Sequence, residues 1–249
     1  MRLALLVLLA ASASAQVNTE RMRRQLADDG LFVTVDAAAS LATGNTDFLQ
    51  IGLGGWMDLR FGENTAFLIG RLDLAQSDER AFVDQSFAHV RHNRTLAPRV
   101  VAESFVQVQR NRQERLDTRA LLGAGLRVEV VQRDSLGLAV GVTPMFEREV
   151  LDEALGGTQD AVGRVSSYVA GRVTLASGTA LTATTYVQPR VSAPGDLRVL
   201  SQLSLDVGLT RFLKLRIRAD LRYDSRPPPE VETTDLRIEN GLVFVFPAG

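Results

Sequence analysis

The feature that most constrains this chain is an alternation of apolar and polar residues with a period of two. Over residues 213–224, apolar or amphipathic residues at the odd positions alternate with charged residues at the even positions. Successive side chains of a strand point to opposite faces, so a strand collects all the charges on one face. A helix would scatter the same charges around its circumference. The segment therefore predicts a β-strand with one apolar and one charged face.

The same alternation recurs along the chain, separated by turn signals such as Gly44–Asp47. Most segments are about ten residues long, the length with which a tilted strand spans a bilayer. An even number is what single-chain bacterial barrels use. The sequence predicts an all-β fold, an antiparallel up-and-down transmembrane β-barrel of about 12 strands. The predicted strands are 31–43, 48–60, 65–75, 82–92, 100–111, 118–130, 136–148, 162–174, 180–191, 198–209, 213–224 and 233–246.

Alternation alone does not say which face meets lipid, because a soluble lipocalin-like barrel alternates with its apolar face inward. Membrane-length strands favour the transmembrane form, as does an apolar face that tolerates Ala37, Ala39 and Ala102. Aromatic residues make up only 6% of the chain, so girdles at the membrane surfaces would be thin. A soluble periplasmic β-barrel is therefore the alternative.

The N-terminus has the features of an export signal. Arg2 precedes an apolar run, and Ala13–Ala15 form an A-x-A-like cleavage site before Gln16. After residue 15 no stretch of about 18 consecutive apolar residues occurs, which excludes a helical membrane protein. The predicted organisation is a signal peptide (1–15), a periplasmic N-terminal segment (16–30), an outer-membrane β-barrel (31–246) and a C-terminal tail (247–249).

Composition excludes several functions. Lys and Arg (28) almost balance Asp and Glu (29), so nothing favours nucleic-acid binding. The absence of Cys excludes disulfides and thiolate metal sites, and no acidic spacing typical of a calcium loop occurs. The two histidines, His89 and His92, have opposite parity on one strand and cannot join one site without a bulge. We therefore expect no metal, no cofactor and no catalytic residues, and a protein that is not an enzyme.

The polar face of the predicted barrel supplies the candidate functional residues, as the lining of a lumen. One interpretation is a narrow channel for ions or small solutes with a charge-lined lumen. The other is a closed structural or partner-binding barrel, filled by charges that neutralise one another. In particular, we expect Arg216, Arg218 and Arg222 to pair with Asp206, Asp235 and Glu239 on neighbouring strands. The candidates are Arg60, Arg71, Asp73, Glu103, Arg119, Arg127, Glu129, Arg164, Arg172, Asp206, Lys214, Arg216, Arg218, Asp220, Arg222, Asp224, Asp235, Arg237 and Glu239.

Residues 222–229, RYDSRPPP, resemble a loop near the end of the salt-induced outer-membrane protein family, also called domain of unknown function 481. The turn at 43–47 and the strand segment LGAGL at 122–126 are similar to the family's opening hairpin and central strand. The resemblance spans roughly residues 31–246. It implies a bacterial outer-membrane barrel and carries no established activity.

Such a barrel would have outer-membrane lipid and the barrel-assembly machinery as partners. The machinery usually reads a C-terminal aromatic residue. Here Phe244 and Phe246 are followed by Pro247, Ala248 and Gly249, which is a departure from that pattern.

Overall fold

The computed structural model describes residues 29–42, 48–77, 80–152, 157–175, 178–210 and 213–244. These residues form a 12-stranded sheet in which each strand pairs with its sequence neighbours, all antiparallel. A 3₁₀ turn, η2 (Arg112–Glu114), lies between the fifth and sixth strands. The strands are β1 (Gly30–Ala42), β2 (Phe48–Phe61), β3 (Asn64–Ser77), β4 (Arg80–Ala97), β5 (Val100–Asn111), β6 (Leu116–Arg133), β7 (Leu136–Leu151), β8 (Gln159–Thr174), β9 (Ala180–Arg190), β10 (Ala193–Gly208), β11 (Leu213–Asp224) and β12 (Thr234–Phe244).

The predicted fold class is confirmed, and each of the twelve strands overlaps its predicted segment. The differences lie at strand ends. β7 continues to Leu151, so Glu149 belongs to a strand and not to the predicted loop. β10 begins at Ala193, five residues earlier than predicted, before a register shift between Ala193 and Leu197. The predicted signal peptide, most of the predicted periplasmic segment, the turn at 43–47 and the 247–249 tail lie outside the described residues.

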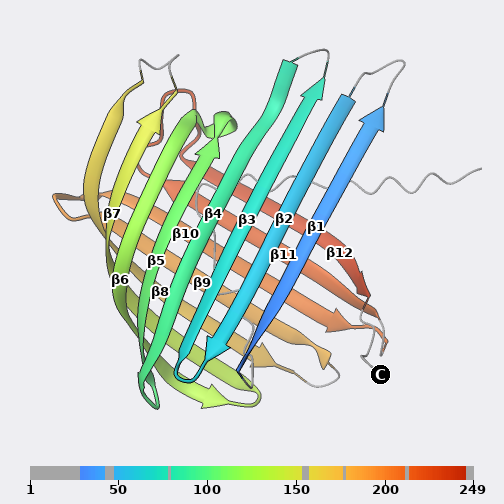
Figure 1. Cartoon of the computed structure of the whole chain (residues 1–249), viewed down its shortest axis with the longest axis vertical. Coiled ribbons are helices and arrows are strands. Elements are labelled where there is room, and N and C mark those ends of the chain that lie inside the picture. Colours follow the sequence, from blue (N-terminus) through green and yellow to red (C-terminus); the bar gives the residue numbers. More distant parts are fainter. Residues whose placement is uncertain are drawn as a thin grey trace, which may run out of the picture.

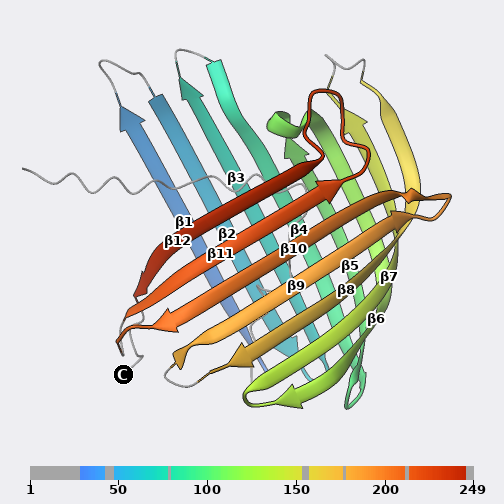
Figure 2. The ribbon, with the colours of Figure 1, turned by 180° about the vertical axis from the view of Figure 1, so that it is seen from behind.

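The sheet curls so that its two halves face each other. In Figure 1 the strands β1 to β6 lie in front of β8 to β12, and Figure 2 shows the second half from behind. β1 and β12 are the two edges of the curled sheet. The strands are steeply inclined to one another across the interior, as the tilt of a barrel requires. Among the described residues, no helix has the length and apolar character needed to cross a membrane.

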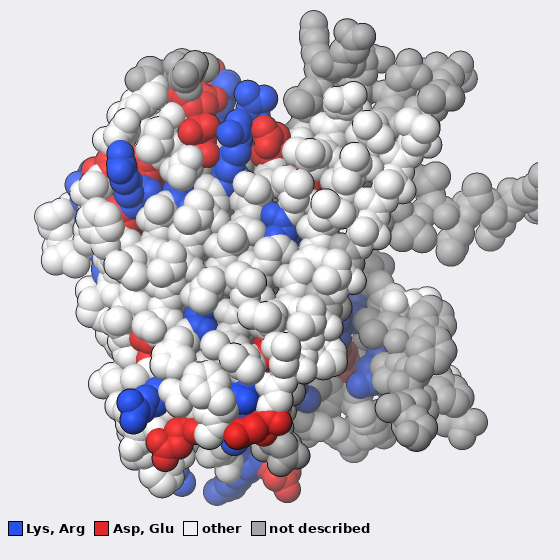
Figure 3. All heavy atoms as spheres, in the orientation of Figure 1, with Lys and Arg blue, Asp and Glu red and all other residues white. Residues whose placement is uncertain are grey.

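The two faces of the sheet have opposite chemistry. Outward side chains are large, apolar and accessible, for example Val35 (77% exposed) and Ile238 (66%). Inward side chains include charged residues as buried as Arg164 and Glu147, both 3% exposed. In the face shown in Figure 3, charges gather toward the two ends, with a largely uncharged surface between them. A soluble barrel would bury the apolar face, so this arrangement is the reverse of the soluble alternative.

The two ends of the sheet also differ. At one end, which we call the turn end, the connections are tight, as at Gly62 between β2 and β3, where φ is +58°. At the other end, which we call the mouth, lie η2, the β7–β8 connection and the connection at 225–233 between β11 and β12. This asymmetry is typical of outer-membrane barrels, which have short turns at one end and longer loops at the other.

Glycines on the inward face make room for large side chains from the next strand. A Cβ on Gly141 of β7 would collide with the ring of Tyr168 on β8, and a Cβ on Gly123 of β6 would collide with the ring of Phe105 on β5. The two rings therefore lie against the glycines of the neighbouring strands. At these two positions the inward face has no space for an added side chain.

Candidate functional site: the charged interior

The densest cluster of inward charges lies toward the mouth, on β6 to β11. Glu147 accepts a hydrogen bond from Arg198 and forms an ion pair with Arg164, whose Nε lies 3.2 Å from Oε2. Glu149 is bonded by Arg119 at 2.6 Å and by Arg198 at 3.0 Å. These four inter-strand contacts join β6, β7, β8 and β10. We call this set, with Asp196 and Asp224, the mouth network.

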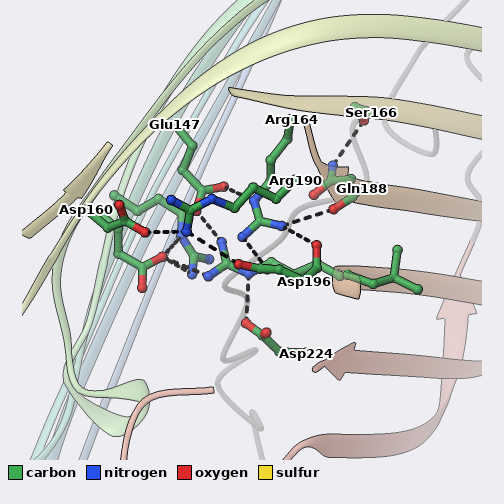
Figure 4. A network of polar contacts seen from close by, with 12 residues as sticks. Glu147, Asp160, Arg164, Ser166, Gln188, Arg190, Asp196 and Asp224 are labelled. Carbon is green, nitrogen blue, oxygen red and sulfur yellow. Dashed lines mark hydrogen bonds and ion pairs between the residues drawn. The ribbon is translucent and has the colours of Figure 1, made fainter. Parts of the chain in front are cut away.

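The remaining members extend the mouth network along the wall (Figure 4). Asp196 binds Arg164 at 2.8 Å and Arg190 at 3.6 Å. Asp224 on β11 binds the Nε of Arg198 at 2.7 Å. The guanidinium of Arg164 also donates to the backbone carbonyls of Gln188 and Asp196. Buried charges are stable only when paired and hydrogen-bonded. Each charge of the network has an ion-pair partner, although the buried Nε of Arg164 makes no hydrogen bond.

A second cluster, centred on Tyr168, lies between β4 and β8. The Tyr168 hydroxyl donates to Glu103 of β5 at 2.6 Å and accepts from Arg127 of β6 at 3.3 Å. Arg127 also binds Glu129 at 2.7 Å, and Arg91 approaches Glu103 at 3.9 Å. One tyrosine thus links three strands across the concave inner surface.

The histidines occupy opposite faces, as their parity predicts. His89 is 2% exposed on the inward face, stacked among the rings of Phe67, Phe87 and Phe105, and its Nδ1 lies 3.0 Å from Oε1 of Gln107. His92 is exposed and contacts Asn64. β4 continues to Ala97, so His92 lies within the strand and not at its end. Among the described residues, neither histidine forms a hydrogen bond with a hydroxyl group that could act as a nucleophile.

The mouth is crossed by contacts between distant segments. Arg115, which follows η2, binds Asp152 beyond β7 and Glu230 in the 225–233 connection. Both carboxylates, Glu230 first, raise the pKa of Arg115. We call these three residues the mouth latch. Ser225 also ties the connection to β10, since its Oγ accepts from the Leu197 amide at 2.8 Å.

The β11 charges pair only partly as predicted. Arg216 binds Asp206 through Nη2 at 2.7 Å, as expected. Arg222 instead reaches across the mouth and donates to Glu114 of η2 at 3.0 Å. Arg218 lies directly opposite Glu239 in the register, but Glu239 pairs with Arg237 at 2.8 Å. No ion pair of Arg218 within 4.0 Å occurs in the part of the chain that the structure describes.

The structure places the predicted lumen residues on the inward face of their strands, and it brings most of them into ion pairs. Arg60 is a half-buried residue of β2. Between described residues, no ion pair is found for Arg172, Lys214, Arg218, Asp220 or Asp235. Whether the set lines a water-filled path remains a prediction. The pairs are Arg71–Asp73, Arg91–Glu103, Arg119–Glu149, Arg127–Glu129, Arg164–Glu147, Arg198–Asp224, Arg216–Asp206, Arg222–Glu114 and Arg237–Glu239.

Several members of the clusters were absent from the predicted set. Asp196 and Glu149 lay in predicted connections, and only the longer strands β10 and β7 turn them inward. Their parity matches that of Arg198 and Glu147, so extending the alternation by one or two residues would have found them. The contacts of Glu114 and Tyr168 could not be found in this way, because their partners lie on strands that are not their sequence neighbours. The parity of Tyr168, which is that of Arg164, indicated only that its side chain faces inward.

A family model described as a protein of unknown function, DUF481, matches residues 35–246. The chain belongs to this family. The match covers all but the first four residues of the predicted barrel and agrees with the resemblance carried by residues 222–229. No curated protein matches this DUF481 chain significantly.

Among solved structures, the NanC porin is similar to this DUF481 protein, with a TM-score of 0.51 and 9% sequence identity. The alignment covers 87% of this chain and 100% of the porin chain. At that identity the likeness concerns the fold alone. The DUF481 chain therefore has a porin-like β-barrel fold.

Proposed function

We propose that this protein is a bacterial outer-membrane β-barrel that forms a narrow channel for ions or small solutes. The observation that carries the proposal is the reversal of its faces. Large aliphatic side chains such as Val35 and Ile238 point outward and are exposed, while Glu147 and Arg164 are buried inside. An apolar outer surface is favourable in contact with the hydrocarbon of a membrane and unfavourable in contact with water.

The strand lengths support a membrane location. The strands have 11 to 18 residues, and about 9 to 11 tilted residues suffice to span a bilayer. The longer strands would then project beyond the membrane at the mouth. Extraction of the membrane fraction tests this location: the protein should require detergent, and release by salt or carbonate alone would favour the soluble periplasmic alternative.

Export belongs to the same proposal. Cleavage between Ala15 and Gln16 would release the mature chain into the periplasm, and the assembly machinery would read an aromatic residue near the C-terminus, such as Phe246. Mass spectrometry of the membrane-bound protein should find Gln16 as the first residue. A membrane-bound chain that begins at Met1 would refute the export signal.

A channel is favoured over a solid barrel because charged inward side chains stay accessible. The side chain of Arg71 is 45% exposed and that of Arg216 is 31% exposed, although both point inward. The mouth network and the mouth latch favour the second candidate, a closed barrel with a structural or partner-binding role. They fill the mouth side with paired charges.

Conductance of the refolded protein in planar bilayers separates the two candidates. The channel predicts discrete current steps in the unmodified protein. A closed barrel predicts none, even when mobility in SDS gels confirms that the protein is folded. Arg115→Ala, which opens the mouth latch, should leave a channel conducting; steps that occur only in this variant would support a barrel that is closed by its loops.

A further inference from the structure

One row of inward side chains on β8 to β11 differs from the rest of the interior. Arg172 lies opposite Thr182 in the register, Thr182 opposite Ser204, and Ser204 opposite Arg218. Arg172, Thr182 and Ser204 have the same parity as the buried residues of β8, β9 and β10, so they face inward. Arg218 lies opposite Ser204 in the register and therefore faces inward too. Two arginines therefore flank two small hydroxyl side chains on one line across the inner wall.

The two arginines lack a carboxylate partner within the described part of the chain. Neither has an ion pair there within 4.0 Å, whereas Arg164 and Arg198 each bind two or more carboxylates. Arg172 is exposed, and the buried Nε of Arg218 has no hydrogen-bond acceptor among the same residues. A guanidinium that faces the interior without a carboxylate can bind an anion that enters from solution.

Two of the carboxylates close to Arg218 are bonded by other arginines. Asp206 is held by Arg216 at 2.7 Å and Glu239 by Arg237 at 2.8 Å. Lys214, two positions from Arg216 on the same face of β11, has no ion pair with any described residue. Asp220, two positions from Arg218 on the same strand, also has no ion pair with a described residue, and its buried Oδ1 accepts no hydrogen bond from one. Asp235 on β12 also has no ion pair with a described residue, so three such cations face two such anions and one positive charge is left in excess.

The spacing suits one solute between the two arginines. Three strand intervals separate Arg172 from Arg218, about 14 Å along the wall. Two long side chains can converge from this separation, and the wall between them carries only the small side chains of Thr182 and Ser204. The Thr182 hydroxyl donates to the Ser204 carbonyl at 3.5 Å.

We propose that this row, Arg172, Thr182, Ser204 and Arg218 together with Lys214, binds anionic solutes through their carboxylate or phosphate oxygens. Guanidinium groups match such oxyanions geometrically, and rings of Arg or Lys select anions in pores. The inference rests on the proposed channel and names the class of its solute. Anion binding by the row itself does not require conduction, so the two claims are separable.

Binding is tested with inorganic phosphate and the full-length protein refolded in a non-ionic detergent. The transverse relaxation of the ³¹P signal should speed up with the unmodified protein. Arg172→Gln together with Arg218→Gln should abolish most of this effect. Arg148→Gln is the matched control, because Arg148 is exposed on the outward face near the mouth and binds only Gln159 in a described contact. Equal relaxation in all three proteins would overturn the proposal.

Selectivity is tested by reversal potentials in a salt gradient across a planar bilayer. The unmodified protein should prefer anions, and each glutamine substitution should lower the anion-to-cation permeability ratio by about threefold, the Coulomb effect of one charge several ångströms from the path. Arg218→Lys should retain the preference, which also shows that a change at this site is compatible with folding.

The outcomes separate the two claims. Phosphate binding without any current would support the row as an anion site and refute the channel. Current whose selectivity is the same in the unmodified protein, Arg172→Gln and Arg218→Gln would support the channel and refute the row. A preference for cations in the unmodified protein would also refute the row.

Discussion

Removal of Arg198 should be among the most destabilising single changes on the inward face. Its side chain is 8% exposed and binds Glu147, Glu149 and Asp224 from three directions. Breaking a buried ion pair costs about 3–5 kcal/mol. Glu147 and Glu149 each keep a second arginine, so the carboxylate left unpaired is mainly Asp224, and we expect a loss at the lower end, about 3 kcal/mol for Arg198→Ala.

The assay is equilibrium unfolding in urea of the protein refolded into lipid vesicles. Trp56 on β2 is the only tryptophan, so its fluorescence reports one place in the sheet. Arg148→Ala, an exposed outward arginine, is the control and should cost about 1 kcal/mol or less. A loss for Arg198→Ala within about 0.5 kcal/mol of this control would refute the reasoning, because surface substitutions fall in that range.

A double-mutant cycle identifies the unpaired carboxylate. If Asp224 is the group left without a partner, then Asp224→Ala should cost little in the background of Arg198→Ala. The two losses should then sum to at least about 1 kcal/mol more than the loss of the double variant, as expected for residues in direct contact. Additive losses would mean that Asp224 finds another partner or water, and that the mouth network is less tightly coupled than its distances indicate.

Three further changes test other parts of the account. Ile217→Arg should impair membrane assembly far more than Arg218→Ala, because a charge on the lipid face at mid-bilayer costs about 2–4 kcal/mol; equal yields of folded protein would contradict the face assignment. Gly141→Ala should cost about 1–3 kcal/mol, since its Cβ would collide with the Tyr168 ring, and pairing it with Tyr168→Ala should recover part of the loss in the urea assay. Glu230→Gly removes the exposed partner of Arg115 and relieves a φ of +67°, so stability should change by less than about 1 kcal/mol while proteolysis within 225–233 accelerates; unchanged cleavage would argue against the mouth latch.

The strands could be predicted from the sequence because the interior and exterior impose opposite chemistry on alternate residues. β11 shows this most clearly, since Ile217 and Leu221 are exposed while Arg216 and Arg222 face inward. A slip of one residue would exchange the two faces, so the register is fixed by the pattern itself. Strand ends carry less information, because both faces can be polar there. The extensions of β7 and β10 were missed for that reason.

The candidate site could be predicted only as a face, not as a set of contacts. Pairing between neighbouring strands gave the Arg216–Asp206 ion pair correctly. The contact of Arg222 with Glu114 joins residues 108 positions apart and depends on how far the sheet curls. Alternation carries no information about that curvature. It likewise could not show that Glu239 pairs along its own strand with Arg237 rather than with Arg218 across the seam.

The central claim, that the apolar face meets lipid and the charged face lines the interior, is tested most directly by a spin-label scan of β11. The chain has no Cys, so single cysteines at positions 215 to 222 give unambiguous labels. In vesicles, labels at the odd positions should be quenched by oxygen dissolved in the lipid, and those at the even positions by a water-soluble nickel complex. The opposite alternation, or none, would contradict the account.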